Sequence, residues 1–141
     1  MNDLVRFVIP GEPVGKGRPR VVQRNGFTHT YTPEKTASFE NLVKLCYNDQ
    51  ANRLQFDPEA ELAIRIEAMF SIPKSASKRV KDMMRLGIIR PKKKPDLDNV
   101  LKAVADALNE IAYHDDSQIV YVEATKKYSE QPETIVTIWE L

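Results

Sequence analysis

Basic and acidic side chains stand in adjacent blocks in the stretch RPKKKPDLDNVLKAVADAL, residues 90–108. Three lysines, 92–94, come directly before Asp96 and Asp98. Two carboxylates about 4 Å apart repel each other by about 4 kcal/mol at an effective dielectric constant near 20, and a divalent cation removes that cost. Carboxylate oxygens without neighbouring thiolates suit Mg²⁺, or Mn²⁺ in its place, and these ions also bind phosphate oxygens. The stretch therefore predicts a metal ion held beside a polyanion.

The spacing within this stretch suggests where the carboxylates point. Asp96 and Asp98 lie two residues apart on the approach to a helix, and in extended backbone such side chains point to the same side. We therefore expect both carboxylates to face one point. Lys102 follows one helical turn after Asp98, which also fits an exposed ion pair worth about 0.3–0.5 kcal/mol. Asp98 alone also fits a helix N-cap.

A second acidic pair, Asp115 and Asp116, follows the same helix. A helix over 98–111 spans about 20 Å at 1.5 Å per residue. The second pair can therefore reach the first only if the next strand runs back along the helix and begins near the site. The neighbouring His114 fits a surface or packing residue better than a general base.

Charge is distributed unevenly along a chain whose formal net charge is only +1. Residues 74–94 carry nine basic residues against one acidic residue, a net +8, whereas residues 95–141 carry three against ten, a net −7. Such asymmetry favours a nucleic-acid or phosphate partner beside an acidic site. The alternative is a basic helix that is simply solvated on one side.

Composition excludes several classes of protein. Cys46 is the only cysteine of the 141 residues, which leaves neither a disulfide framework nor a thiolate zinc site, and its apolar neighbours predict a buried thiol in a reducing compartment. No apolar run approaches the roughly 18 residues of a membrane span, and the first residues lack a signal-peptide core. We expect a cytoplasmic protein with no membrane contact.

Patterning predicts one domain over residues 1–141 with the element order βββαβααββ. The N-terminal half reads as a strand at 4–9, a Gly- and Pro-rich loop, a hairpin turning at Asn25-Gly26, and a helix with Thr32 as N-cap and Pro33 at its first position. The alternating segment 61–70 is the clearest strand.

The C-terminal half reads as two helices followed by two strands. A basic helix from Ser77 to Leu86 ends at Gly87, and a strongly amphipathic helix runs to about Ile111. A strand from about Gln118 and a last strand over TIVTIWEL are expected to pair antiparallel. The fold class is α+β, with about three helices on a mostly antiparallel or mixed sheet.

The segment KPDLDNVLKAVADALNEIAYHDDSQIVYVEATK closely resembles the signature of the RusA-type Holliday-junction resolvases, the crossover junction endodeoxyribonucleases of bacteria and their prophages. That pattern runs Asp-x-Asp-Asn, a Lys four residues after the second Asp, Asp-Ala-Leu, and Asp-Asp-x-Gln-Val/Ile. The segments PGEPVGKGRPR and YTPEKT also resemble the phage-type branch of the family. Every element of the signature is present, as Asp96, Asp98, Asn99, Lys102, Asp106 to Leu108, Asp115, Asp116, Gln118 and Ile119.

The resemblance implies a homodimeric, Mg²⁺-dependent endonuclease that nicks four-way DNA junctions symmetrically in recombination and repair, with no nucleotide cofactor. It assigns the metal-binding carboxylates to Asp96, Asp98 and Asp116, and the catalytic lysine to Lys102. Some members carry a basic residue directly before the first Asp, where this chain has Pro95. We expect Lys92 to Lys94 to supply that charge.

Two related nicks on opposite strands require two sites, and one chain carries a single acidic cluster, so a two-fold dimer is expected. Basic segments would then bind phosphates in a largely sequence-independent, salt-sensitive way. Phe27, Tyr31 and Tyr113 fit packing better than stacking on unpaired bases, and Trp139 fits the core or a dimer interface. The DNA-binding candidates are Lys16, Arg18, Arg20, Lys92, Lys93 and Lys94, followed by Lys78, Arg79 and Lys81.

Other functions fit the same residues less well. A metal-dependent nuclease for flaps, replication forks or structured RNA would carry an identical acidic site. A non-catalytic junction-binding protein predicts the loss of an aspartate, yet every acidic position of the signature is filled. A small phosphatase or nucleotide hydrolase explains the acids but not the many basic residues.

Overall fold

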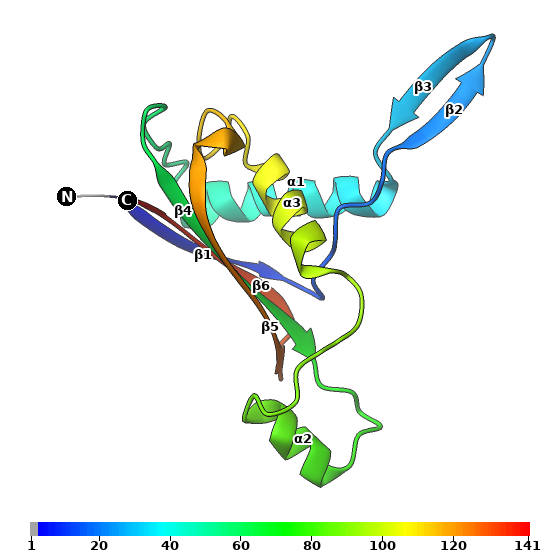
Figure 1. The fold of residues 1–141 in the computed structure, drawn as a ribbon, viewed down its shortest axis with the longest axis vertical. Helices are drawn as coiled ribbons and strands as arrows, with labels where there is room; N and C mark the ends of the chain where they lie inside the picture. Colours follow the sequence, from blue (N-terminus) through cyan, green and yellow to red (C-terminus); the bar gives the residue numbers. More distant parts are fainter. Residues whose placement is uncertain (1–2) are drawn as a thin grey trace.

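The computed structural model describes residues 3–141 as a four-stranded sheet, two helices on one of its faces, a third helix beyond it and a separate two-stranded hairpin (Figure 1). The predicted element order and the α+β class, with a mixed sheet and three helices, are confirmed. The elements are β1 (Leu4–Pro10), β2 (Arg20–Arg24), β3 (Phe27–Tyr31), α1 (Glu34–Gln50), β4 (Leu62–Ser71), α2 (Lys78–Arg85), α3 (Leu97–Ala107), the 3-10 turn η1 (Asp116–Gln118), β5 (Ile119–Ser129) and β6 (Glu133–Glu140).

The sheet has the strand order β1-β6-β4-β5, in which β6 runs antiparallel to both β1 and β4, and β5 runs parallel to β4. The prediction that the last two strands pair with each other is therefore wrong. The turn after β5 carries the chain past the end of β4 instead. The burial patterns explain this order. β6 is buried at five consecutive positions, as a central strand requires, whereas β5 has no buried position, as an edge strand can.

The core lies between the sheet and the helices α1 and α3. Phe7 of β1 and Tyr47 of α1 meet edge to face with ring centroids 5.3 Å apart. Cys46 is buried in the same layer, as predicted. Each fully buried large apolar side chain contributes about 1.5–3 kcal/mol. In the part of the chain that the structure describes, no helix has both the length and the apolar character to cross a membrane.

The helix ends differ in how well the sequence predicts them. Ser77 caps α2, its hydroxyl accepting a hydrogen bond from the Val80 amide, and Gly87 follows the helix with a positive φ of 77°. At α1 the predicted cap is one residue off, since Pro33 occupies the cap position and makes no side-chain capping bond. Thr36, in the first turn, instead accepts a hydrogen bond from the amide of Gly17.

The loop that joins β1 to the hairpin passes between the first turns of α1 and α3. The Lys16 amide donates to the carbonyl of Asn99 at 2.8 Å. A Cβ on Gly15 would lie 2.8 Å from the Cβ of Pro95, and one on Gly17 would lie 2.9 Å from the hydroxyl of Thr36. Glycine is required at both positions because the backbone approaches its neighbours too closely for a side chain. These close contacts hold the loop, called here the clamped loop, against both helices and fix the position of Lys16.

Gly15→Ala should destabilise the protein by about 1–3 kcal/mol, because the added methyl group overlaps Pro95 and the start of α3. Urea unfolding followed by circular dichroism measures the loss. The exposed Ser75, changed to alanine, serves as a control that should leave the midpoint within experimental error. Equal stability of Gly15→Ala and the parent protein would mean that the loop is not clamped.

Candidate active site

One face of α3 carries three charged residues at successive helical turns, Asp98, Lys102 and Asp106. The opposite face is apolar and buried, so packing of the helix against the core holds this charged row outward. The sequence analysis assigned roles to Asp98 and Lys102 but none to Asp106. The regular four-residue spacing of these charged residues was the signal from which a role for Asp106 could have been predicted.

A fourth charged residue, Asp116, joins this row from a different element. A hollow of about 260 Å³ is lined by Asp98, Lys102, Asp106 and Asp116. Residues of β5 and α3 make up the rest of its wall, because β5 runs back along the helix, as the sequence argument required. The remaining lining residues are Leu101, Ala105, Ile119 and Val122.

Backbone hydrogen bonds hold Asp116 in place. Its amide donates to the side-chain oxygen of Asn109 at 2.8 Å, just past the end of α3. Gln118 accepts from the amides of His114 and Asp115 through its oxygen, and donates through its nitrogen to two carbonyls in the loop before β4. Gln118 therefore fastens the turn that carries Asp116 onto the body of the protein.

The carboxylate of Asp115 caps the turn η1. It accepts a hydrogen bond from the Ser117 amide at 3.1 Å. Hydrogen bonding to the side chain of Ser117 first, and to this amide second, lowers the pKa of Asp115. Together with Gln118 it forms a capping box at the start of η1. A structural role thus accounts for Asp115.

Lys16 reaches the site from the clamped loop. Its ammonium lies 2.5 Å from a carboxylate oxygen of Glu40 on α1 and 3.4 Å from one of Asp106. Burial lowers the pKa of Lys16, but the hydrogen bond and charge of Glu40, with the charge of Asp106, outweigh that effect and raise it. With a side chain only 17% exposed, Lys16 stays charged inside an acidic network. Its predicted contact with DNA stays a prediction.

Asp116 is the carboxylate least satisfied by its surroundings. Burial raises its pKa first, and the neighbouring carboxylates of Asp115 and Asp106 raise it further, against the opposing charge of Lys102. Lys102 is mostly exposed and stands 3.9 Å from Asp106. The pair of Asp106 and Asp116 therefore has more negative charge than its neighbours neutralise, which is a setting that a cation would stabilise.

Asp96 lies apart from this hollow. It occupies the N-cap position of α3, where its carboxylate pairs with Lys94 at 2.9 Å, an interaction that lowers the pKa of Asp96. It lines a different hollow, together with Gly15, Lys16 and Asn99. The extended geometry assumed for Asp96 and Asp98 does not form, because the helix begins between them at Leu97 and turns their side chains in different directions.

The donor atoms at the site fit a hard divalent cation, because they are carboxylate oxygens without thiolate or imidazole partners. Among residues 3–141, however, no three acidic, histidine or cysteine side chains stand close enough together to hold a metal ion as a group. Asp106 and Asp116 are close neighbours, and Asp98 lines the same hollow. A third carboxylate therefore has to change its side-chain conformation before all three reach one ion.

Comparison with known proteins identifies the family of the chain. A family model described as "Endodeoxyribonuclease RusA" matches residues 10–139, nearly the whole chain. The chain belongs to the RusA endodeoxyribonuclease family. It is also 37% identical over 139 residues to "Uncharacterized protein YqaN" of Bacillus subtilis (strain 168), an alignment that covers 99% of this chain and 98% of the other. The resemblance found in the sequence is confirmed at the level of the family.

Membership of the RusA family makes the charged hollow the candidate place of DNA hydrolysis. The matched region includes Asp96 and all four charged residues of the hollow. An endodeoxyribonuclease must bring a phosphodiester, a water and a means of neutralising charge to one point. The row on α3 and Asp116 supply acidic and basic groups at such a point.

Exposed basic residues of this RusA-family chain lie in the segment before α3 and at the base of the hairpin. Lys93 is held in the segment before α3 by Lys126, which donates to its carbonyl at 2.7 Å, while both ammonium groups lie over the ring of Phe70. Lys92 and Lys94 are exposed beside it, and Arg18 and Arg20 are exposed at the base of the hairpin. These positions are compatible with phosphate contacts on two sides of the site.

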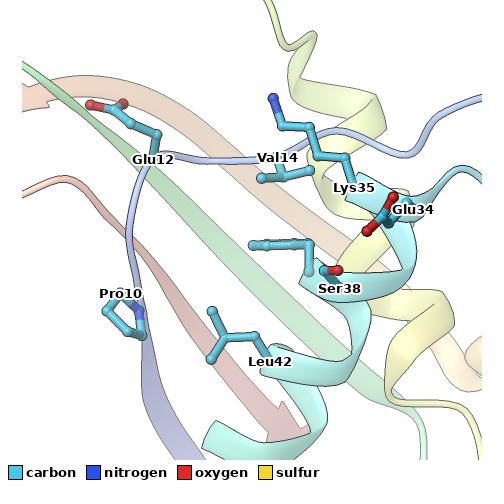
Figure 2. A pocket seen from close by; sticks show the side chains of 8 residues that line it. Pro10, Glu12, Val14, Glu34, Lys35, Ser38 and Leu42 are labelled. Atoms are coloured by element: carbon cyan, nitrogen blue, oxygen red, sulfur yellow. The ribbon is translucent and has the colours of Figure 1, made fainter.

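A further cavity, of about 500 Å³, lies elsewhere (Figure 2). Its lining comes from the end of β1, the loop after it and the first half of α1, and it shares no residue with the charged hollow. Four of its lining residues are apolar and four are polar or charged. The lining residues are Pro10, Glu12, Val14, Glu34, Lys35, Ser38, Phe39 and Leu42.

Asp116→Asn should raise the stability of the folded protein at pH 7. A carboxyl group whose folded-state pKa is raised destabilises the fold at pH values above that pKa, and the penalty disappears below the ordinary value of 3.8. The variant should therefore melt a few degrees higher than the parent at pH 7, with the difference shrinking as the pH falls toward 4. Thermal unfolding across pH 4–8 measures this.

Asp115→Ala is the matched control and should act in the opposite direction. The pKa of Asp115 is lowered, so its ionised form stabilises the fold above pH 3.8, and its removal also deletes the cap of η1. A lower melting temperature for Asp116→Asn at pH 7 would contradict the assignment of repulsion at this site.

Proposed function

We propose that this chain is a divalent-metal-dependent endonuclease that resolves four-way DNA junctions by paired, symmetric nicks in DNA recombination and repair. The observation that carries the proposal is the meeting of Asp98, Lys102 and Asp116 around one hollow, with Asp106 beside them, in a chain of the RusA endodeoxyribonuclease family. The phage-type resemblance of the N-terminal segments supports a prophage origin.

The proposed cofactor is Mg²⁺, with Mn²⁺ able to replace it. Asp98 and Asp116 would hold it, with Asp106 as a neighbour that the structure adds. Asp96, the third ligand expected from the family signature, would have to leave its pairing with Lys94 to join them. A divalent cation at these oxygens would lower the pKa of a water and neutralise charge on the phosphate. The excess negative charge around Asp116 supports this assignment.

Each basic residue has a separate proposed role. Lys102 is exposed and only loosely paired, so its ammonium can turn toward a phosphate oxygen of the scissile bond and neutralise it. Lys16 is held by Glu40 and pairs with Asp106, which keeps that carboxylate in place. Arg18, Arg20 and Lys92 to Lys94 would bind the phosphates of the junction arms, without reading sequence.

A homodimer follows from the two-fold symmetry of the substrate. The sheet face opposite α1 and α3 supports it, because Tyr121 and Trp139 flank Ala63 there and Arg65 lies 5.3 Å from the ring of Trp139. Tyr121 remains half exposed on this face. We propose this aromatic surface as the contact between two copies.

The purified protein should nick a synthetic four-way junction at symmetric positions on opposite strands in Mg²⁺, and should stop doing so in EDTA. Asp98→Asn should lower the rate about 100-fold or more, because even residues that only support metal ligands contribute 10–100-fold. Asp49→Asn on the exposed side of α1 is the matched control and should retain full activity. Gel analysis of end-labelled strands measures the cuts.

The other substrates in the same experiment test the alternatives. Linear duplex should be cut poorly if the enzyme recognises the junction. Equal or faster cutting of a flap would replace the resolvase by a general nuclease of branched DNA. Tight junction binding with no cutting in Mg²⁺ or Mn²⁺ would favour a non-catalytic junction-binding protein.

Lys102→Met should separate the role of the lysine from that of the carboxylates. Nicking should fall about 100-fold, the scale for loss of one group that stabilises developing charge. The rise in melting temperature on adding Mg²⁺ should persist, because metal that binds only the folded state stabilises it whether or not catalysis occurs. In Asp116→Asn that rise should disappear. If Lys102→Met also abolishes it, the lysine acts by organising the carboxylates.

A further inference from the structure

The hairpin of β2 and β3 extends away from the body of the protein (Figure 1). Nearly every residue in it is exposed. Between residues 18 and 31 the chain carries Arg18, Arg20 and Arg24 and no acidic residue. An arm of one charge sign that contributes nothing to the core is suited to a partner of the opposite charge.

The strand register sorts the residues of the hairpin onto two different faces. Directly paired residues point to the same face, and the pairs alternate between faces along the strands. One face, called here the arginine–aromatic face, carries the pairs Arg20 with Tyr31, Val22 with His29, and Arg24 with Phe27. The other carries only Val21, Gln23, Thr28 and Thr30.

The arginine–aromatic face is hollowed. Val22, Arg24, His29 and Tyr31 line a depression of about 310 Å³. Phe27, next to the turn, is 69% exposed, and Tyr31 is 46% exposed at the base, so the expectation that these two rings pack is wrong. Flat aromatic rings alternating with guanidinium groups are the combination that single-stranded nucleic acids bind, with bases stacked on rings and phosphates paired with arginines.

We propose that the arginine–aromatic face binds a strand of DNA whose bases are unpaired at the branch point. Arg20 and Arg24 contact its phosphates, and Phe27 and Tyr31 stack on its bases. This rests on the proposed function, because it concerns the DNA that the charged hollow cuts.

The connection between the hairpin and the charged hollow supports the same partner. Only three residues separate Lys16 from β2, and Lys16 pairs with Asp106 of the hollow. A strand lying on the hairpin is thereby led toward the site of cutting. A protein partner would call for apolar area beyond the few isolated side chains present here.

Equilibrium binding in EDTA tests the proposal without cleavage, using a four-way junction, a single-stranded oligonucleotide and a linear duplex. Phe27→Ala with Tyr31→Ala should weaken binding of the junction and the single strand about fivefold or more, and leave duplex binding unchanged. Arg20→Ala with Arg24→Ala should weaken binding of all three and lower the slope of log K against log salt by roughly one or more.

Matched controls exist on the body of the protein. Leu45 on α1 is 67% exposed, close to the value for Phe27, and Arg6 on β1 is also exposed. Leu45→Ala and Arg6→Ala should bind all three DNAs like the parent protein. Melting temperatures of the hairpin variants should be unchanged, because these side chains lie outside the core.

The outcomes separate this inference from the proposed function. If the parent protein cuts and prefers junctions while the aromatic variant binds every DNA normally, the stacking role is overturned and the proposed function stands. Equal weakening of duplex and single-strand binding in the aromatic variant would overturn it as well. If the parent shows no preference for the junction over the duplex, the proposed function fails, and with it the role of the hairpin at a branch point.

Discussion

The ion pairing of the partly buried Lys16 ammonium is the interaction on which the rest of this structure depends. The ammonium lies between Glu40 of α1 and Asp106 of α3, so that one positive charge joins two helices through their acidic side chains. Removing one partner of a partly buried charged network is more damaging than losing an exposed pair, since a charge shielded from water would be left unpaired. The glycines on either side of Lys16 permit the backbone approach that brings it there. The clamped loop, the pair of helices and the acidic row are thus one arrangement.

The same arrangement leaves the site short of positive charge. Lys16 is shared with Glu40, and Lys102 lies at the far limit of ion pairing with Asp106, while burial and two neighbouring carboxylates all oppose ionisation of Asp116. A fold selected for stability alone would replace one of these acids by a neutral residue. Retaining them makes sense where a cation or a phosphate-bound metal completes the site. The unfavourable electrostatics at Asp116 therefore support a catalytic role for this hollow.

The sequence predicted the elements well where the pattern is local and poorly where it is not. The apolar repeat of α3, the Asn25-Gly26 hairpin and the basic helix from Ser77 are decided by residues within one or two turns of chain, and all three form. The pairing of β6 with β1 and β4 is decided by burial on both sides of the strand, which a short preceding turn does not reveal. The position of Asp96 depended on where α3 begins: the helix starts at Leu97, and Asp96 and Asp98 line different hollows.

The ion pairs between residues far apart in the chain could not be predicted from sequence patterns either. Nothing in the sequence links Lys16 to Glu40 and Asp106, residues 24 and 90 positions away, and a lysine in a glycine-rich loop reads more readily as a phosphate ligand. The structure gives the glycines another purpose, since they let the loop lie against two helices. Arg18, just after the clamped loop segment, is the first arginine of this region that is exposed and can bind DNA. Lys16 belongs to the acidic site, whereas Arg18 is exposed at the base of the hairpin. Because the two residues are so close in the chain, a strand bound to the hairpin would lie near the place where it would be cut.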